Sequence, residues 1–348
     1  MFQPSPLPRF LIVFAACFAM TMVAAGVQGE EAIENVAADS TWITSIAKLG
    51  DSGACVASTA SGLLLQESAV VSFDVDQPTE LKTLYTHPAA AWCVTTSRDG
   101  EAVFSADYRG NLVVYDRASD QAKTYPEALQ RWCQALIVAP DQKSLVAGNE
   151  SGHVLVWDLA DEKVVKTIEL DGHAVTSIAF SPDQSRLAVA DGGGHVHWLA
   201  WPSLESQGKS EISDEPVWCV AFAEGSVASA EGSEQLLLGS GDRHLYRMDA
   251  SPQGQPQSVL QGSDWITELA VAADGTIAAG EVSGKVHLAQ LAESNSQAIA
   301  APSGVWALAW NDAGNLIVGT RKDSLVFVKR QWTLVTPTAP ATSETADE

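Results

Sequence analysis

Short apolar runs separated by turn residues recur along most of the chain, from about residue 40 to residue 335. Many positions in these runs are β-branched, and nothing between the runs has the length or the period of a helix. Runs of about five to eight such residues between turns predict β-strands. Residues 132–170 contain four in succession: WCQALIV, SLVAGN, HVLVWDL and VVKTIEL. The pattern therefore predicts an all-β protein.

The four-strand pattern is itself repeated. RWCQALIVAPDQKSLVAG, at 131–148, aligns without gaps with HAVTSIAFSPDQSRLAVA, at 173–190. One four-stranded antiparallel sheet cannot bury both of its faces, so repeated sheets must pack face to face around an axis. We therefore predict a seven-bladed β-propeller of four-stranded antiparallel blades over residues 40–335. Its units begin near Trp42, Ala90, Trp132, Ala174, Pro216, Trp265 and Gly304, about 40 to 50 residues apart.

Paired residues mark fixed places in several units. Gly172-His173 opens one unit, SIAFSPDQSRLAVA follows it, and Trp157-Asp158 closes the third strand of another. This arrangement resembles the WD-repeat family, in a divergent form of an exported bacterial type. Weaker forms of the closing pair are Phe73-Asp74, Tyr115-Asp116 and Met248-Asp249.

The resemblance implies a hydrogen-bonded group of His, Ser or Thr, Asp and Trp in each blade. Only isolated members stand at matching positions, such as His173, Trp157 and Asp242. We therefore expect this group to be missing from most blades and hydrophobic packing to hold them together.

The two ends of the chain differ from the repeats. Residues 1–29 have Arg9, an apolar run over 10–20 and small residues near Ala25 and Gly29, which is the order of a secretory signal. We predict cleavage after Gly29, with Ala25 as the alternative and a retained membrane anchor as the other interpretation. Residues 30–39 form an N-terminal extension, and 336–348, rich in Thr, Ala, Pro and acid, form a disordered tail. The expected location is periplasmic or secreted, without membrane insertion after signal removal.

Charge and cysteine content narrow the function. The 43 Asp and Glu outnumber the 20 Lys and Arg, and the net charge of −23 would repel a phosphate backbone, which disfavours nucleic-acid binding. No Cys-x-x-Cys occurs. Cys93, Cys133 and Cys219 lie in first strands, where we expect them to project to one side as buried free thiols, while Cys55 is expected in a loop without a mate.

The first strand of each unit should line the central channel. Across all seven first strands only Lys48 and Glu268 are charged and no His occurs, so a channel metal site or a carboxylate catalytic group is not expected. We predict a non-enzymatic protein without cofactor or metal. A quinoprotein-like or lactonase-like propeller enzyme is an alternative that would need loop acids, for example Asp99, Asp107, Asp191 or Asp242.

Histidines give a weaker metal signal. His153, His195 and His244 follow turns at equivalent places on successive blades, too far apart to share one ion, and are expected at the surface. His195 and His197 share one strand face, so a weak metal site there is conceivable, although ordinary polar residues beside a turn are the more usual outcome.

Tryptophan dominates the start of the first strands. Three indoles share one alignment column and three share the column two residues later, which faces the same way in a regular strand. Such residues either pack between blades or form a recognition surface, of which at least three members should then be partly exposed. We call them the tryptophan collar: Trp42, Trp92, Trp132, Trp218, Trp265 and Trp306. In the WD-repeat family these columns lie at the channel mouth, on the face where partners usually dock.

The resulting hypothesis is a protein-interaction scaffold of the cell envelope that binds a protein or peptide through the collar. A carbohydrate-binding propeller is an alternative, because sugar rings stack on exposed indoles. The sequence names neither the partner nor the oligomeric state.

Three connections carry local expectations. Residues 50–62 and 224–235 are rich in small and polar residues and are expected to be extended hairpins or loops between first and second strands. The final blade has its own candidate fourth strand at 331–335, so closure by the N-terminal segment 32–37 is treated as optional.

Overall fold

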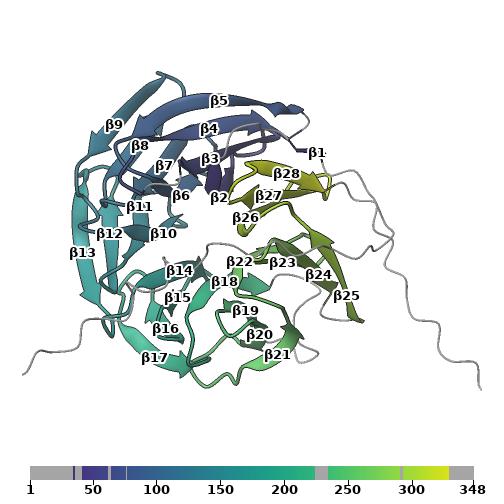
Figure 1. Ribbon diagram of the computed structural model, residues 1–348. Coiled ribbons are helices and arrows are strands. Elements are labelled where there is room, and N and C mark those ends of the chain that lie inside the picture. Colours follow the sequence, from purple (N-terminus) through teal and green to yellow (C-terminus); the bar gives the residue numbers. More distant parts are fainter. Residues whose placement is uncertain are drawn as a thin grey trace, which may run out of the picture. The chain divides into compact units, whose positions relative to one another are not determined.

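Seven antiparallel sheets follow one another along the chain (Figure 1). The computed structural model describes residues 34–35, 41–61, 64–75, 77–223, 234–290 and 293–328. Strands and turns account for the regular structure over these ranges, which contain no helix. Accordingly, no helix among them offers the length and apolarity needed to cross a membrane.

Each blade is built from strands in sequence order. The first three blades contain β2 (Trp42–Lys48), β3 (Ala54–Ala60), β4 (Ser68–Asp74) and β5 (Gln77–His87); β6 (Ala91–Thr96), β7 (Ala102–Asp107), β8 (Leu112–Asp116) and β9 (Gln121–Tyr125); and β10 (Cys133–Val138), β11 (Ser144–Asn149), β12 (His153–Asp158) and β13 (Lys163–Glu169). The next three contain β14 (Val175–Phe180), β15 (Arg186–Asp191), β16 (His195–Ala200) and β17 (Ser206–Glu211); β18 (Val217–Ala223), β19 (Gln235–Ser240), β20 (His244–Asp249) and β21 (Gln257–Gln261); and β22 (Ile266–Val271), β23 (Thr276–Glu281), β24 (Lys285–Gln290) and β25 (Glu293–Ala300). The seventh contains β26 (Val305–Trp310), β27 (Leu316–Thr320) and β28 (Leu325–Val328).

The blades form a closed ring around their first strands. Each first strand contacts the first strand of the next blade, and β26 of the last blade contacts β2 of the first. Figure 1 shows these seven strands on the inside and the fourth strands on the outside. Hydrophobic clusters fill the spaces between neighbouring sheets. The predicted all-β, seven-bladed propeller is therefore confirmed.

The seventh blade is completed from the other end of the chain. Its three sequential strands are joined by β1 (Glu34–Asn35), which pairs antiparallel with β28 through Glu34 opposite Phe327 and Asn35 opposite Val326. On the sequence alone, closure of the ring by the N-terminal segment is treated as optional. In the structure, that segment does provide the fourth strand of the seventh blade. A strand of two residues is too short for its amino-acid composition to predict it. It forms here because the edge of β28 lies beside it. The expected alternative at 331–335, the signal at 1–29 and the tail at 336–348 lie outside the described residues.

A β-bulge occurs at one position in all seven first strands. The ladder to the second strand skips one residue there, and the skipped residues are Thr44, Trp92, Gln134, Thr176, Trp218, Thr267 and Trp306. A bulge reverses the alternation of side chains. The residues immediately before and after it pair with consecutive residues of the second strand, so they face opposite neighbouring blades.

This reversal explains how side chains of one blade pack closely against the second strand of the preceding blade. The residue before each bulge points to the preceding blade, where it meets a small residue in the second strand. A Cβ atom added at Gly148 would lie 2.2 Å from Cγ1 of Val175, and one at Gly280 would lie 2.4 Å from Cγ1 of Val305. These glycines therefore allow a β-branched side chain of the next blade to approach the sheet.

The same close packing corrects an expectation about residues 50–62. They are not an extended loop, because β3 occupies Ala54–Ala60 and its residues are almost all buried. Cys55 thus lies in a second strand rather than in a loop. The Ala and Ser content that suggested a loop reflects the small side chains required between blades. Most of the corresponding segment of the fifth unit, residues 224–233, lies outside the described residues.

The bulge also changes the geometry of the cysteines. Cys133 precedes the bulge in its strand and Cys93 follows it, so they point toward each other, and their Sγ atoms lie 3.8 Å apart. Our expectation that they do not face one another is wrong, because it assumed regular alternation. All four described cysteines are nevertheless buried free thiols, as predicted for Cys93, Cys133 and Cys219, whereas the burial of Cys55 was not expected. Burial raises the pKa of Cys55 to about 11 and those of Cys93 and Cys219 well above the usual value.

Candidate functional site: the tryptophan collar and a histidine–aspartate cluster

The six collar indoles form one continuous set of ring contacts. The ring centroids are 5.7 Å apart for Trp265 and Trp218, 6.4 Å for Trp218 and Trp306, and 5.3 Å for Trp306 and Trp42. The series continues through Trp92, 5.1 Å from Trp42, to Trp132, 4.7 Å from Trp92. Trp92 and Trp306 also touch at 6.0 Å although the first blade stands between their blades. The indoles therefore converge over one end of the channel.

The collar lies at the end of the ring where second strands turn into third strands. The amide after a second strand donates to a carbonyl at the start of the adjacent first strand: Glu150 to Trp132, and Val282 to Trp265. Tyr108, from the equivalent turn of the second blade, packs on Trp132 at 5.0 Å. The collar thus borders the turns of this face.

Exposure differs within the collar. Trp42 and Trp92 are buried, with 4% and 9% of their surface exposed, and they form a small core with Ala60 and Ala90. The other four indoles are half-buried: Trp132, Trp218, Trp265 and Trp306. Two indoles are thus packed in the core, and four retain exposed surface, which meets the condition that at least three members be partly exposed.

Four collar indoles have an N–H group that is buried without a hydrogen-bond acceptor: Trp42, Trp132, Trp218 and Trp306. A buried donor without an acceptor is costly, typically about 1 to 3 kcal/mol. Most of the neighbouring surface is aromatic carbon and supplies none.

Each first strand that contributes to the collar has a Trp at only one of two positions, the bulge or the position two residues before it. The other position holds a smaller or non-aromatic residue. Where the first strand has its Trp at the bulge, the residue two before it is small or cyclic: Ala90, Pro216 or Gly304. Where the Trp comes first, the bulge residue is Thr or Gln. Thr44 and Thr267 use their hydroxyl groups to donate to the carbonyl of the next blade, over 2.7 Å in each case. The fourth blade has Ala174 and Thr176 at these places, and it is the gap in the collar.

Acceptor side chains at the ends of second strands hold the turns beside the collar. Asp107 Oδ1 accepts hydrogen bonds from the amides of Arg109 and Asn111, and Asn149 Oδ1 accepts from those of Ser151 and His153. These turns need a left-handed residue, and Gly152 supplies it with φ of +80°. The loop acids considered for a catalytic role are therefore bound within their own turns.

Part of the hydrogen-bonded group expected from the WD-repeat resemblance survives in the second blade. His87 Nε2 lies 2.7 Å from Ser105 Oγ, its Nδ1 lies 3.4 Å from Asp107 Oδ2, and the hydroxyl of Tyr85 bonds Ser105 over 2.8 Å. Burial alone raises the pKa of Asp107, but the bonds from His87 and Asn111 more than offset it and hold that pKa below its usual range.

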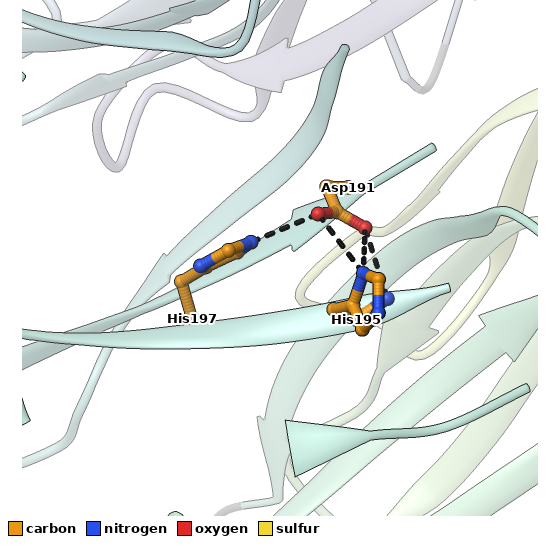
Figure 2. Close-up of side chains that lie close together, drawn as sticks. All are labelled: Asp191, His195 and His197. Atoms are coloured by element: carbon orange, nitrogen blue, oxygen red, sulfur yellow. Dashed lines mark hydrogen bonds and ion pairs between the residues drawn. The ribbon is translucent and has the colours of Figure 1, made fainter. Parts of the chain in front are cut away.

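The fourth blade brings two histidines and one aspartate together (Figure 2). Asp191 is fully buried at the end of β15, and Asp191 Oδ2 lies 2.8 Å from His197 Nε2. The Nδ1 atom of His195 lies 3.2 Å from Oδ1 and 3.3 Å from Oδ2 of the same carboxylate. Burial acts to raise the pKa of Asp191, yet hydrogen bonds from His197 and from the His195 amide hold it below the usual value.

The three histidines at equivalent turns begin third strands, as predicted. His153, His195 and His244 are partly exposed at the surface and half-buried. The ring of His153 lies beside Gln130 at 3.2 Å, and His244 lies 3.4 Å from Asp242. Their blades keep them apart from one another as predicted, whereas sequence reasoning missed that Asp191 joins His195 and His197. The contact could have been predicted from the position of Asp191 at the turn between the second and third strands, four residues before His195.

Comparison with protein families gives one match. Residues 163–198 match the family model described as WD domain, G-beta repeat, and this range covers β13 to β16, including Asp191, His195 and His197. No curated protein matches the chain. The four third strands that end in Asp, at Asp74, Asp116, Asp158 and Asp249, stand where the family has its closing pair. The chain is therefore a seven-bladed β-propeller that contains a match to the WD repeat, and the family match and the ring of seven four-stranded sheets both support a WD-repeat propeller.

Proposed function

We propose that this protein is a non-enzymatic interaction scaffold of the cell envelope that binds a protein or peptide through the tryptophan collar. WD-repeat propellers generally mediate protein–protein interactions and are generally not enzymes. The placement in the envelope rests on the signal-like order of residues 1–29. The choice of surface rests on the collar.

The observation that carries the proposal is the combination of exposed indole surface and unpaired indole donors. Trp132, Trp218 and Trp306 are half-buried, and each has an N–H group without an acceptor. An extended peptide suits this surface, because its apolar or proline side chains stack on the exposed parts of the rings, and its backbone carbonyls can accept from the buried N–H groups once the indoles rotate. Aromatic residues in such positions are typical binding hot spots.

Selection of peptides by the full chain tests the proposal directly. A displayed library of random peptides is selected on the wild-type protein, and the affinities of the recovered peptides are then measured for wild type, Trp218→Ala and Trp201→Ala. Trp201 is a matched control, because it is half-buried and packs on Phe180 in the fourth blade, outside the collar. We expect Trp218→Ala to weaken binding about 30-fold, equivalent to about 2 kcal/mol, and Trp201→Ala to leave it unchanged.

The result also separates the alternatives. Peptides whose affinity responds equally to both substitutions, or to neither, would place the binding surface elsewhere and refute the collar. Binding of glycans with the same dependence on Trp218, and no binding of peptides, would instead establish the carbohydrate alternative. The enzyme alternative needs loop acids that converge, whereas Asp107, Asp191 and Asp242 lie in three different blades, each bonded to groups of its own blade.

A further inference from the structure

Three blades place a carboxylate at the end of the second strand together with a histidine, which provides an internal comparison. In the second blade, Asp107 bonds one imidazole and the amide group of Asn111. In the sixth blade, Glu281 bonds the imidazole of His287 over 2.6 Å and the hydroxyls of Ser263 and Ser283. Each of these carboxylates has one imidazole, and other side chains complete its hydrogen bonds.

The fourth blade departs from this arrangement. Among the described residues, no hydroxyl or side-chain amide bonds the carboxylate of Asp191, and the second side chain on it is a second imidazole. Its Oδ1 atom already accepts from the amides of Gly193 and His195, each over 2.9 Å. Oδ2 lies 2.8 Å from Nε2 of His197, while Nδ1 of His195 lies between the two oxygens, 3.2 Å from Oδ1 and 3.3 Å from Oδ2. One buried carboxylate thus faces two histidine nitrogens.

The two imidazoles come from one strand. His195 and His197 are two residues apart in β16, which is regular at this point and pairs with β15 through His197 opposite Val189. Residues two apart in a regular strand project to the same face. The backbone therefore fixes both imidazoles on the side of Asp191, and Figure 2 shows both rings directed at its carboxylate.

We propose that Asp191, His195 and His197 bind a divalent transition-metal ion, with Zn²⁺ as the expected occupant. The ligand atoms are Oδ2 of Asp191, Nδ1 of His195 and Nε2 of His197, and one ligand atom from each residue lies within 4.8 Å of the others. Zinc holds nitrogen and oxygen ligands at about 2.0 to 2.2 Å, and small rotations of the rings bring three such atoms onto one ion. Binding uses each imidazole as the neutral tautomer with its proton on the nitrogen that does not bind the ion, Nε2 of His195 and Nδ1 of His197, so each ring exchanges its N–H position through solvent and no net proton is released. Imidazole and carboxylate ligands suit zinc and its first-row neighbours rather than Ca²⁺ or Mg²⁺.

The surroundings give an ion access to this site. His195 is half-buried, and the exposed His173 lies beside it with ring centroids 6.0 Å apart. Gly193 makes room for His173, because a Cβ atom there would lie 2.5 Å from its Cδ2. The ion pair of Lys209 and Asp171 lies beyond the three ligands. His173 is thus the nearest additional imidazole to the proposed ion.

The site also adjoins the one gap in the tryptophan collar. The amide of Gly192, next to Asp191, donates to the carbonyl of Ala174 over 2.8 Å, and Ala174 occupies the collar column of the fourth blade. An ion here would stand at the rim where the collar has no indole. Metal binding by Asp191, His195 and His197 does not require that the collar bind a peptide.

Metal titration of the full chain, produced without a histidine tag and stripped with a chelator, tests the proposal. Zn²⁺ binding is measured by calorimetry, and Co²⁺ serves as a spectroscopic probe whose visible absorption reports nitrogen and oxygen ligands. Wild type, His195→Gln, His197→Gln and His153→Gln are compared. His153 is the matched control, because it is half-buried at the equivalent position of β12 but lies beside Gln130 instead of a carboxylate.

We expect one Zn²⁺ per chain for wild type and His153→Gln, and affinity at least about tenfold weaker for His195→Gln and His197→Gln. Loss of binding in His195→Gln with an unchanged thermal midpoint of the metal-free protein would support the proposal even if His197→Gln folded poorly. Absence of stoichiometric Zn²⁺ binding by wild type would overturn it. So would binding that survives both substitutions unchanged, or that falls equally in His153→Gln.

Discussion

Glu268 makes stability depend on pH in a direction opposite to that of most carboxylates. It lies in β22, directly after the bulge, where the hydrogen bond to its carboxylate comes from the amide of Leu269 over 3.0 Å. Burial raises the pKa of Glu268 to about 7. An ordinary Glu in the unfolded chain has a pKa of 4.5. The native state therefore keeps a proton between about pH 4.5 and 7 that the unfolded state has lost.

The sign and size follow from this difference. Because the folded pKa is raised, unfolding releases a proton in this window, so the free energy of unfolding falls as pH rises from about 4.5 to 7. A shift of about 2.5 pKa units corresponds to about 3.4 kcal/mol at 1.36 kcal/mol per unit. The side chain is half-buried by its exposed area, and solvent screening reduces the expected effect to about 2 kcal/mol.

Replacing Glu268 by Gln should remove this penalty while keeping the oxygen that accepts from Leu269. We expect Glu268→Gln to raise the free energy of unfolding by about 2 kcal/mol at pH 8 and to change it little at pH 4.5, measured by urea denaturation at both values. Glu101→Gln, at an exposed position, controls for the loss of one negative charge from the chain. An equal gain at both pH values, or a loss at pH 8, would refute the reasoning.

Other consequences concern packing and the thiols. Trp42→Ala should lower the free energy of unfolding by about 3 to 5 kcal/mol through the cavity it leaves, and Trp218→Ala by clearly less, as denaturant midpoints would show; equal losses would contradict the assigned burial. Gly148→Ala should destabilise by about 1 to 3 kcal/mol because its new methyl overlaps Val175, and Val175→Ala in the same chain should restore part of that loss in thermal unfolding. The four described thiols should resist alkylation at pH 8 until the protein is denatured, as mass spectrometry of the labelled peptides would reveal; rapid labelling of the native protein would exclude their burial. Their residues are Cys55, Cys93, Cys133 and Cys219.

The repeat period was enough to predict the architecture from sequence. The alignment of two stretches at 131–148 and 173–190 fixed the spacing, and apolar runs between turns identified strands, because one four-stranded sheet cannot bury both faces without neighbours. The same alignment placed six indoles in two columns, and the structure does bring them together at one end of the channel. These features depend on composition and period, which a sequence displays directly.

What the sequence left open depends on contacts between distant residues. A bulge in every first strand reversed side-chain direction, which no period-two pattern reveals, and so Cys93 meets Cys133 contrary to expectation. The small residues of β3 resembled a loop because their role is to admit a neighbouring blade. The two-residue strand β1 exists only because β28 presents an open edge to it. Likewise, Asp191 became a partner of two histidines through the pairing of β15 with β16, since strand register rather than local sequence decides which side chains face one another.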